Sequence, residues 1–248
     1  MMKITKLILL SMTVALLGWG CSKSIEEVDS QTRSQEYEGI SGKYTYYSDM
    51  PTVSALQVTM GQETVPAGKD FVVELTQDDV EYLTSLSIDD LERLKTQIME
   101  AYGLNSEEEI ENSIDMAFDN ICKDMSEEEE IQFYQFVTGY LDETPLVVNG
   151  KVSKENTKVA CIMNSELEDV YIRAAVAIDK FARPLYNTIG STRSAGECKK
   201  YLAYRLAIAS ISCMYTAMFP GGGAVAVVQG ICEGITAINY YRVCLRTR

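Results

Sequence analysis

Cysteine is the residue type in this sequence that offers the most chemistry. The chain has seven cysteines and no histidine among 248 residues. Without an imidazole, no Ser-His-Asp triad, Cys-His pair or histidine metal site can be assembled. The thiols can instead carry a lipid, form disulfides in an oxidising compartment or bind zinc. They are Cys21, Cys122, Cys161, Cys198, Cys213, Cys232 and Cys244.

The first cysteine follows a stretch that is typical of an export signal. Lys3 and Lys6 precede an apolar run over residues 7–17, which is followed by Gly18-Trp19-Gly20-Cys21. A basic start, a short hydrophobic middle and small residues at the cut are the marks of a signal peptide. The apolar run is shorter than the roughly 20 residues of a membrane-spanning helix. We therefore predict a signal peptide over residues 1–20.

The sequence LLGWGC at the end of this signal resembles the lipobox of bacterial lipoproteins. In that family the cysteine is lipidated and becomes the new N-terminus. This chain departs from the family pattern at Gly18, where leucine is preferred, and at Trp19, where a small residue is preferred. The resemblance implies a lipid on Cys21 and an anchor in the cell envelope, at the outer membrane or cell surface rather than the inner membrane. The alternative is ordinary signal cleavage nearby, with Cys21 as a thiol.

The six remaining cysteines are an even number, which in an exported protein suits three disulfide bonds. Cys122 and Cys161 are candidates for bonding to each other. The four C-terminal cysteines are separated by 15, 19 and 12 residues. Structural zinc sites use closely spaced pairs of ligands, so this spacing favours disulfides over zinc. We expect neither a metal nor a cofactor.

The C-terminal cysteines lie on a predicted pair of helices. Residues 198–219 are rich in helix formers, residues 220–223 are Pro-Gly-Gly-Gly, and residues 224–244 can form a second helix. Two antiparallel helices joined by a short loop make an αα-hairpin. Gly230 and Gly234 form a GxxxG step, which allows the helix backbones to approach closely.

The hairpin restricts which cysteines can bond. Along one helix, Cys198 and Cys213 would lie about 22 Å apart, whereas a disulfide requires Cα atoms within roughly 7 Å. Counted from the turn, Cys213 is level with Cys232, and Cys198 is level with Cys244. We therefore predict two nested disulfides, Cys213–Cys232 near the turn and Cys198–Cys244 at the open end.

Earlier helices are predicted by their N-terminal caps. In four places a hydroxyl residue stands three positions before a carboxylate, an arrangement that satisfies the free amides of a first helical turn. These caps are Thr76, Ser87, Ser106 and Ser126, and they predict helices over about residues 77–85, 88–102, 107–124 and 127–141. A longer helix is expected after residue 164, with one buried face and a kink or an end at Pro184.

Short strands complete the predicted fold. Strand-like patterns cover residues 43–47, 54–60, 70–75 and 158–163. Asn149-Gly150, between apolar residues, predicts a tight β-hairpin. We therefore expect a mainly α fold with a minor β component, in the α+β class, that ends in the disulfide-linked hairpin.

Charge divides the chain into two parts. Residues 22–195 have 34 acidic and 14 basic side chains, whereas residues 196–248 have two acidic and six basic ones. After the signal peptide we predict a lipidated tether over residues 21–43 and an acidic α+β domain over residues 44–190. Residues 191–248 are predicted to form a cationic, cysteine-rich helical hairpin.

These features favour an exported, lipid-anchored protein without enzymatic activity. Its membrane contact would be the N-terminal lipid, and its stapled hairpin would be structural or would engage a protein partner. The acidic body disfavours nucleic-acid binding. A hydrolase that uses carboxylates, Cys122 or Cys161 is the enzymatic alternative, but the acidic residues form no recognisable catalytic pair.

A second interpretation concerns the apolar C-terminal segment. Residues 196–248 resemble cysteine-rich, halocin-like bacteriocins in composition and in cysteine spacing. The resemblance implies a precursor with an acidic pro-region, whose C-terminal peptide is released to act on a target membrane or form a pore. Arg193, in the polar linker over residues 187–197, is then the candidate processing site.

Overall fold

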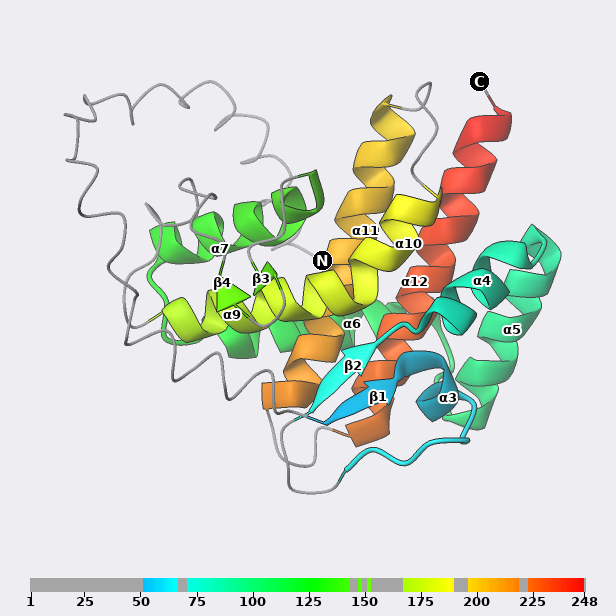
Figure 1. The fold of residues 1–248 in the computed structure, drawn as a ribbon, viewed down its shortest axis with the longest axis horizontal. Coiled ribbons are helices and arrows are strands. Elements are labelled where there is room, and N and C mark those ends of the chain that lie inside the picture. Colours follow the sequence, from blue (N-terminus) through cyan, green and yellow to red (C-terminus); the bar gives the residue numbers. More distant parts are fainter. Residues whose placement is uncertain are drawn as a thin grey trace. The chain divides into compact units, whose positions relative to one another are not determined.

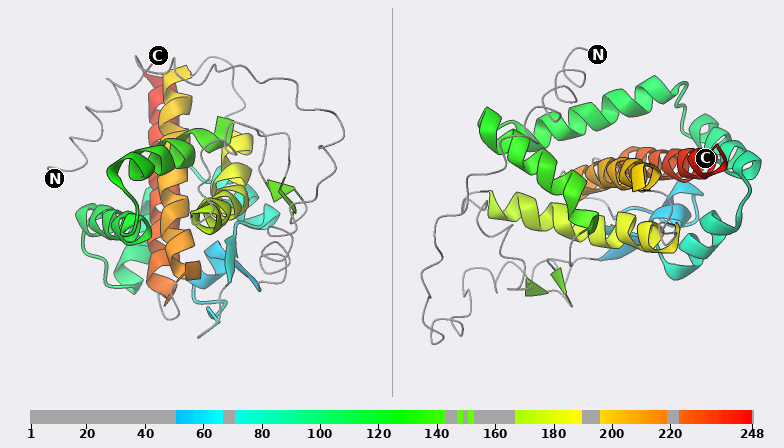
Figure 2. Two further views of the ribbon diagram at one scale, coloured as in Figure 1. Left: turned by 90° about the vertical axis from the view of Figure 1, so that its left-hand side faces the viewer. Right: turned by 90° about the horizontal axis from the view of Figure 1, so that it is seen from above.

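Two long antiparallel helices run through the middle of the fold (Figures 1 and 2). They are α11 (Gly196–Met218) and α12 (Gly223–Arg246), and they form the predicted αα-hairpin. The computed structural model describes residues 51–66, 71–142, 147–148, 151–152, 167–189, 196–218 and 223–247. These residues all belong to one compact unit, Ile40–Arg248.

Shorter helices cover the hairpin on both sides (Figure 2). One side is covered by α5 (Ile88–Ala101), α6 (Glu107–Cys122) and α7 (Glu127–Gly139). The other is covered by α9 (Glu168–Ala177), a π-helical turn (Ile178–Ala182), α10 (Arg183–Ile189) and a small sheet. The fold is mostly helical with a small parallel sheet, which confirms the predicted α+β class.

The hairpin helices are apolar around most of their circumference and are buried accordingly. Leu202, Leu206, Val227, Val228 and Ile238 are each fully shielded from solvent. A helix that is hydrophobic all round is stable in water only inside a core. The change of charge predicted to separate two domains near residue 190 therefore does not separate two packing units, because the hairpin is the core of the acidic part.

Close packing of the two arms depends on one glycine. A Cβ atom on Gly230 would lie 2.8 Å from Cys213 Sγ and 3.1 Å from the carbonyl oxygen of Ala209. At Gly234 the nearest atom to such a Cβ would be 3.6 Å away, on Phe181. Only the first glycine of the GxxxG step thus allows the arms to approach, whereas the second faces the π-helical turn.

The predicted caps begin the predicted helices. Thr76 and Ser126 form reciprocal capping boxes with Asp79 and Glu129 at the starts of α4 (Gln77–Ser85) and α7. The hydroxyls of Ser87 and Ser106 accept backbone N–H bonds at the starts of α5 and α6. All four helices begin where predicted, because each cap satisfies amides that have no partner within the helix.

One predicted strand is largely a helix. Residues 54–60 were expected to be extended, but the strand β1 (Thr52–Ser54) ends where the short helix α3 (Ala55–Thr59) begins. The Ser54 hydroxyl accepts the N–H of Gln57, and Leu56 and Val58 are buried in the core. A local cap and tertiary packing together outweigh the β-propensity of this stretch.

Both described sheets are two-stranded. β1 pairs in parallel with β2 (Val72–Glu74), which lies in the predicted strand over residues 70–75. β3 (Val147–Val148) and β4 (Lys151–Val152) pair antiparallel on either side of Asn149-Gly150, as predicted. The predicted strands over residues 43–47 and 158–163 lie outside the described residues.

The helix around Pro184 is joined to the sheet by contacts of Lys180. The helix was expected to end or kink at Pro184; it continues through this residue, but a π-helical turn that directly precedes α10 interrupts its regular pattern. Proline has no N–H, so it cannot bond to the carbonyl of Lys180, four residues earlier. That carbonyl instead accepts the N–H of Leu75 at 2.9 Å, and Lys180 Nζ lies 3.2 Å from Glu74 Oε2. The end of β2 is thereby attached to the helical layer.

We predict that Gly230→Ala destabilises the protein by about 1–3 kcal/mol, because the added methyl group overpacks the contact with Cys213 and Ala209. Gly234→Ala is the matched control: the methyl group fits, and alanine favours a helix over glycine by up to about 1 kcal/mol. Urea unfolding at fixed pH measures both effects. Equal effects of the two substitutions would contradict the assigned packing.

Candidate functional site

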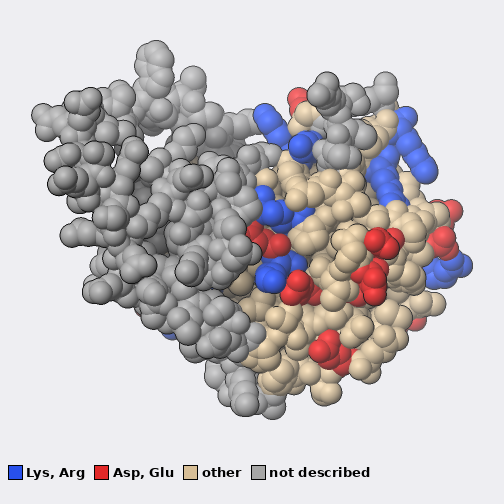
Figure 3. All heavy atoms as spheres, viewed as in Figure 1, with Lys and Arg blue, Asp and Glu red and all other residues tan. Residues whose placement is uncertain are grey.

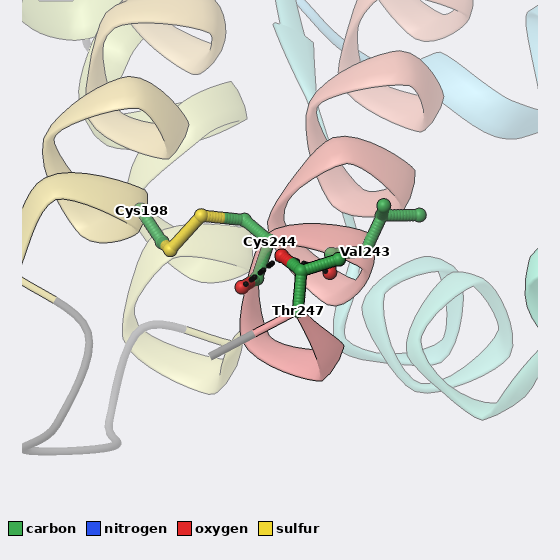
Figure 4. The surroundings of a disulfide bond; sticks show 4 residues. All are labelled: Cys198, Val243, Cys244 and Thr247. Carbon is green, nitrogen blue, oxygen red and sulfur yellow. Dashed lines mark hydrogen bonds between the residues drawn. A yellow bond between two sulfur atoms is a disulfide. The ribbon is translucent and has the colours of Figure 1, made fainter.

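The disulfide at the open end of the hairpin joins α11 to α12 (Figure 4). Cys198 and Cys244 are bonded with their Cα atoms 5.9 Å apart, as the sequence predicts. The bond spans 46 residues, so it closes a ring that includes almost all of both helices. Beside it, the Thr247 hydroxyl donates to the carbonyl oxygens of Val243 and Cys244, which satisfies acceptors at the end of α12.

The predicted inner disulfide is not formed. Cys213 and Cys232 are buried thiols in the structure. Cys213 packs against Gly230, whereas Cys232 stands two residues further along α12, roughly 200° around the helix. Counting residues from the turn gives the level of a residue along a helix but not the direction in which its side chain points. The prediction of Cys213–Cys232 is therefore wrong.

The other cysteines offer no reactive thiolate among the described residues. Burial raises the pKa of Cys122 to about 12 and that of Cys232 to about 12, and it also raises the pKa of Cys213. Thiols in such surroundings stay protonated at neutral pH and are inert. Cys122 is a thiol, and its predicted partner Cys161 lies outside the described residues, as do Cys21 and Arg193.

An ion pair lies between the arms of the hairpin. Arg205 Nε on α11 is 2.7 Å from Glu233 Oε1 on α12, and Arg205 Nη2 donates to Glu233 Oε2 at 3.2 Å. Arg205 Nη1 is also 3.7 Å from Glu111 Oε1 on α6. Burial raises the pKa of Glu233 to about 7, and this effect outweighs the opposing attraction of Arg205. Glu111 and Glu107 raise it further, and Lys95 lowers it.

A second cluster joins α12 to α5 and α6. Lys95 Nζ is 2.6 Å from Glu107 Oε1, 3.0 Å from Glu92 Oε2 and 3.4 Å from the Thr236 hydroxyl. Burial alone would lower the pKa of Lys95, but the two glutamates raise it above its usual value. Asn239 Nδ2 donates to Glu92 Oε1 at 2.6 Å. Polar contacts thus fix the hairpin to the acidic helices.

Three tyrosines lie on the hairpin between these ion pairs and the Cys198–Cys244 disulfide. The rings of Tyr201 on α11 and Tyr240 on α12 have centroids 3.9 Å apart, and Tyr204 is 6.3 Å from Tyr201. Tyr240 is 48% exposed and Val243, three residues along the same helix, is 46% exposed. We call Tyr201, Tyr204, Tyr240 and Val243 the tyrosine face.

The tyrosine face and the ion pairs were missed from the sequence. Arg205 and Glu233 are isolated charges on otherwise apolar helical segments, which is a signal that each requires a partner. The hairpin itself brings the two arms together, so their pairing could have been expected. Glu107, Glu111 and Lys95 gave no comparable signal, because charged residues on amphipathic helices usually face solvent.

The described residues contain no group of three or more potential ligands that could hold a metal ion. Within the same part of the chain, no helix has both the length and the apolar character required to cross a membrane. Comparison with protein-family models, curated protein sequences and solved structures finds no match to this chain.

The raised pKa of Glu233 predicts a pH-dependent stability. Because folding raises this pKa from about 4.5 to about 7, the folded state binds the proton more tightly, and its advantage is lost as pH rises through 7. Relative to Glu233→Gln, the wild type should lose roughly 2–3 kcal/mol of unfolding free energy between pH 5 and pH 8. Urea unfolding of both proteins at both pH values measures this. A constant difference would show that Glu233 titrates normally.

Removing the disulfide should destabilise the fold. For a ring of 46 residues, the chain-entropy model gives about 4 kcal/mol, which Cys198→Ala/Cys244→Ala would lose. The comparison is urea unfolding of wild type and variant, each with and without a reductant. Reductant should lower the wild-type midpoint to that of the variant and leave the variant unchanged. A wild-type midpoint that is unchanged by the reductant would argue against the Cys198–Cys244 disulfide.

Proposed function

We propose that this is an exported, lipid-anchored protein of the cell envelope, without catalytic activity, which binds a protein partner through the tyrosine face of its hairpin. The observation that carries the proposal is the exposure of Tyr240 and Val243 on a helix that is otherwise largely buried. The hairpin then has two roles. Its buried surface organises the fold, and its exposed end presents the binding residues.

The composition of this surface supports a binding role. Tyrosine and arginine are enriched at the residues that contribute most to protein–protein affinity. The Arg205 guanidinium carbon lies 5.9 Å from the centroid of the Tyr201 ring, so a cation–π interaction helps to hold this ring in place. The Cys198–Cys244 disulfide fixes the two helices, which reduces the conformational entropy lost when a partner binds.

The chemistry of the chain supports a protein without catalytic activity. The sequence has no histidine, so it has no imidazole to act as a general base. Glu233, whose pKa burial raises to about 7, is paired with Arg205 inside the fold, where a substrate would not reach it. Its position is consistent with holding the hairpin arms together.

The signal sequence supports the anchor. The lipobox-like LLGWGC would place a lipid on Cys21 and leave the polar segment over residues 22–43 as a tether to the fold. A single acyl chain holds a protein to a membrane only weakly, so a stable anchor at Cys21 requires more than one chain. The tyrosine face would thus be presented close to a membrane surface.

Release of the hairpin as a bacteriocin-like peptide is the less favoured function. The hairpin would have to leave contacts that α4, α5 and α6 make with it. Arg242 donates to the carbonyl oxygens of Leu86 and Thr84 at the end of α4, and Ser113 on α6 donates to Gln229 at 2.5 Å. Extraction would also expose the core of the remaining chain, so the acidic part would not be left as a folded pro-region.

The anchor is tested by replacing Cys21 with Ser. We expect the variant to move from the membrane fraction to the soluble fraction, because it lacks the thiol that accepts the lipid. Ser22→Ala keeps that thiol and is the matched control, which should stay with the membrane. Immunoblots of fractionated cells of the native host report both. Membrane retention of the Cys21→Ser protein would overturn the lipid anchor.

The partner surface is tested by photo-crosslinking in living cells of the native host. A photoreactive amino acid at position 240 should form a discrete crosslinked band with a partner protein. The same amino acid at position 82 is the control, because Tyr82 is similarly exposed (43%) but lies on α4. Crosslinks of equal yield at both positions, or at neither, would contradict the proposed surface.

A further inference from the structure

The ion pairs beside the tyrosine face are asymmetric in their exposure. The Arg205 side chain is 16% exposed, whereas that of its neighbour Glu111 is 58% exposed. The Lys95 side chain is 6% exposed, whereas that of Glu107 is 61% exposed. The cations are therefore inside and the carboxylates are at the surface. A partner that approaches this region therefore meets the carboxylates first, although each ion pair has no net charge.

These carboxylates adjoin the tyrosine face through a continuous series of contacts. Tyr240 stacks on Tyr201, Tyr201 lies against Arg205, and Arg205 lies against Glu111. Glu107 is one helical turn from Glu111 on the same face of α6. Thr236, which contacts the Glu107-bound Lys95, is one turn before Tyr240 on α12. Aromatic rings and exposed carboxylates thus form one surface.

Other charges close to this surface are mixed. Glu197 and Lys200, near the start of α11, are both exposed and have opposite charges, and Arg246, one turn beyond Val243 on α12, is an exposed cation. Arg242 is directed towards α4, where it donates to the carbonyl oxygens of Leu86 and Thr84. Glu92, which is bonded to Lys95, adds a third carboxylate that is 47% exposed. The exposed carboxylates therefore still outnumber the exposed cations, which are Lys200 and Arg246. On the face of the molecule shown in Figure 3, Lys and Arg side chains are interspersed with Asp and Glu.

From this arrangement we infer that the partner, whose existence rests on the proposed function, presents a basic segment. An arginine or lysine side chain of that segment lies over the tyrosine face and pairs with Glu107 and Glu111. An aromatic ring attracts a cation through its quadrupole, and carboxylates at its edge add to this attraction. Arginine suits the surface best, because its planar guanidinium both stacks on rings and forms two parallel bonds to a carboxylate.

A small cationic probe tests the chemistry directly on the full-length chain. Fluorotyrosine at position 240 gives one ¹⁹F signal, and fluorotyrosine at position 82 gives a control signal. N-acetyl-arginine amide at millimolar concentration should shift the signal at 240 in a saturable way and leave the signal at 82 unchanged. N-acetyl-citrulline amide has nearly the same shape without the charge, and it should shift neither. Equal responses to the two probes would overturn the inference.

Substitutions identify the carboxylates. Glu111→Gln should weaken arginine amide binding about two- to fivefold, because it removes one rim charge while Arg205 keeps its pairing with Glu233. Glu107→Gln should have an effect of similar size. Glu109→Gln is the matched control: it removes the same charge from α6, but from the opposite side of the helix, two residues from both Glu107 and Glu111. Weakening by Glu109→Gln equal to that by Glu111→Gln would contradict a specific site.

Crosslinking at position 240 separates failure of this inference from failure of the proposed function. In cells, Glu107→Gln/Glu111→Gln should lower the yield of the crosslinked partner several-fold. An unchanged or increased yield would mean that a partner binds there but is neutral or acidic, which overturns the basic segment alone. The absence of any crosslink in the wild type would overturn the proposed function and, with it, this inference.

Discussion

The two hairpin helices exclude water along most of their length, and most of the other described elements pack against them. Neither arm can be covered by the other alone, because each is apolar on several sides. Helices with one apolar face therefore surround the pair, and their polar faces carry the acidic excess of the chain.

The few polar groups that this arrangement buries require a polar partner, and Glu233 with Arg205 is the clearest case. A buried pair of this kind adds little net stability, but the loss of one member leaves an uncompensated charge.

Local signals in the sequence predicted local structure well. The caps at Thr76 and Ser126 act within a single helical turn, so their effect needs no knowledge of the rest of the fold. Asn149-Gly150 and Pro184 are similar cases, since backbone geometry alone restricts what they can form. The stretch after Ser54 was predicted wrongly as a strand. Its helical conformation depends on the burial of Leu56 and Val58 against helices that come much later in the chain. Composition alone also could not show that the basic end of the chain lies inside the acidic part.

The candidate site was predicted less completely than the fold. The outer disulfide followed from the lengths of the two arms, because its cysteines lie at the open end, where the helices have the freedom to bring them together. The inner pair failed because rotation around the helix axis directs Cys213 and Cys232 differently, and that rotation is set by the close approach at Gly230. To predict the tyrosine face, one would have to know the register of the two hairpin helices and which parts of them the surrounding helices leave exposed. Neither can be read from a single helical pattern.

The Cys198–Cys244 bond has a topological consequence. It makes the segment between those residues a covalent ring. A protease that cuts the backbone once anywhere inside the ring opens it without dividing the molecule, since both fragments remain tied through sulfur and through their mutual packing. The bond therefore confers tolerance to a single backbone cut at the centre of the core, which would matter most if the protein is exported as proposed. A nicked molecule would keep its mass under non-reducing conditions and separate into two pieces only on reduction.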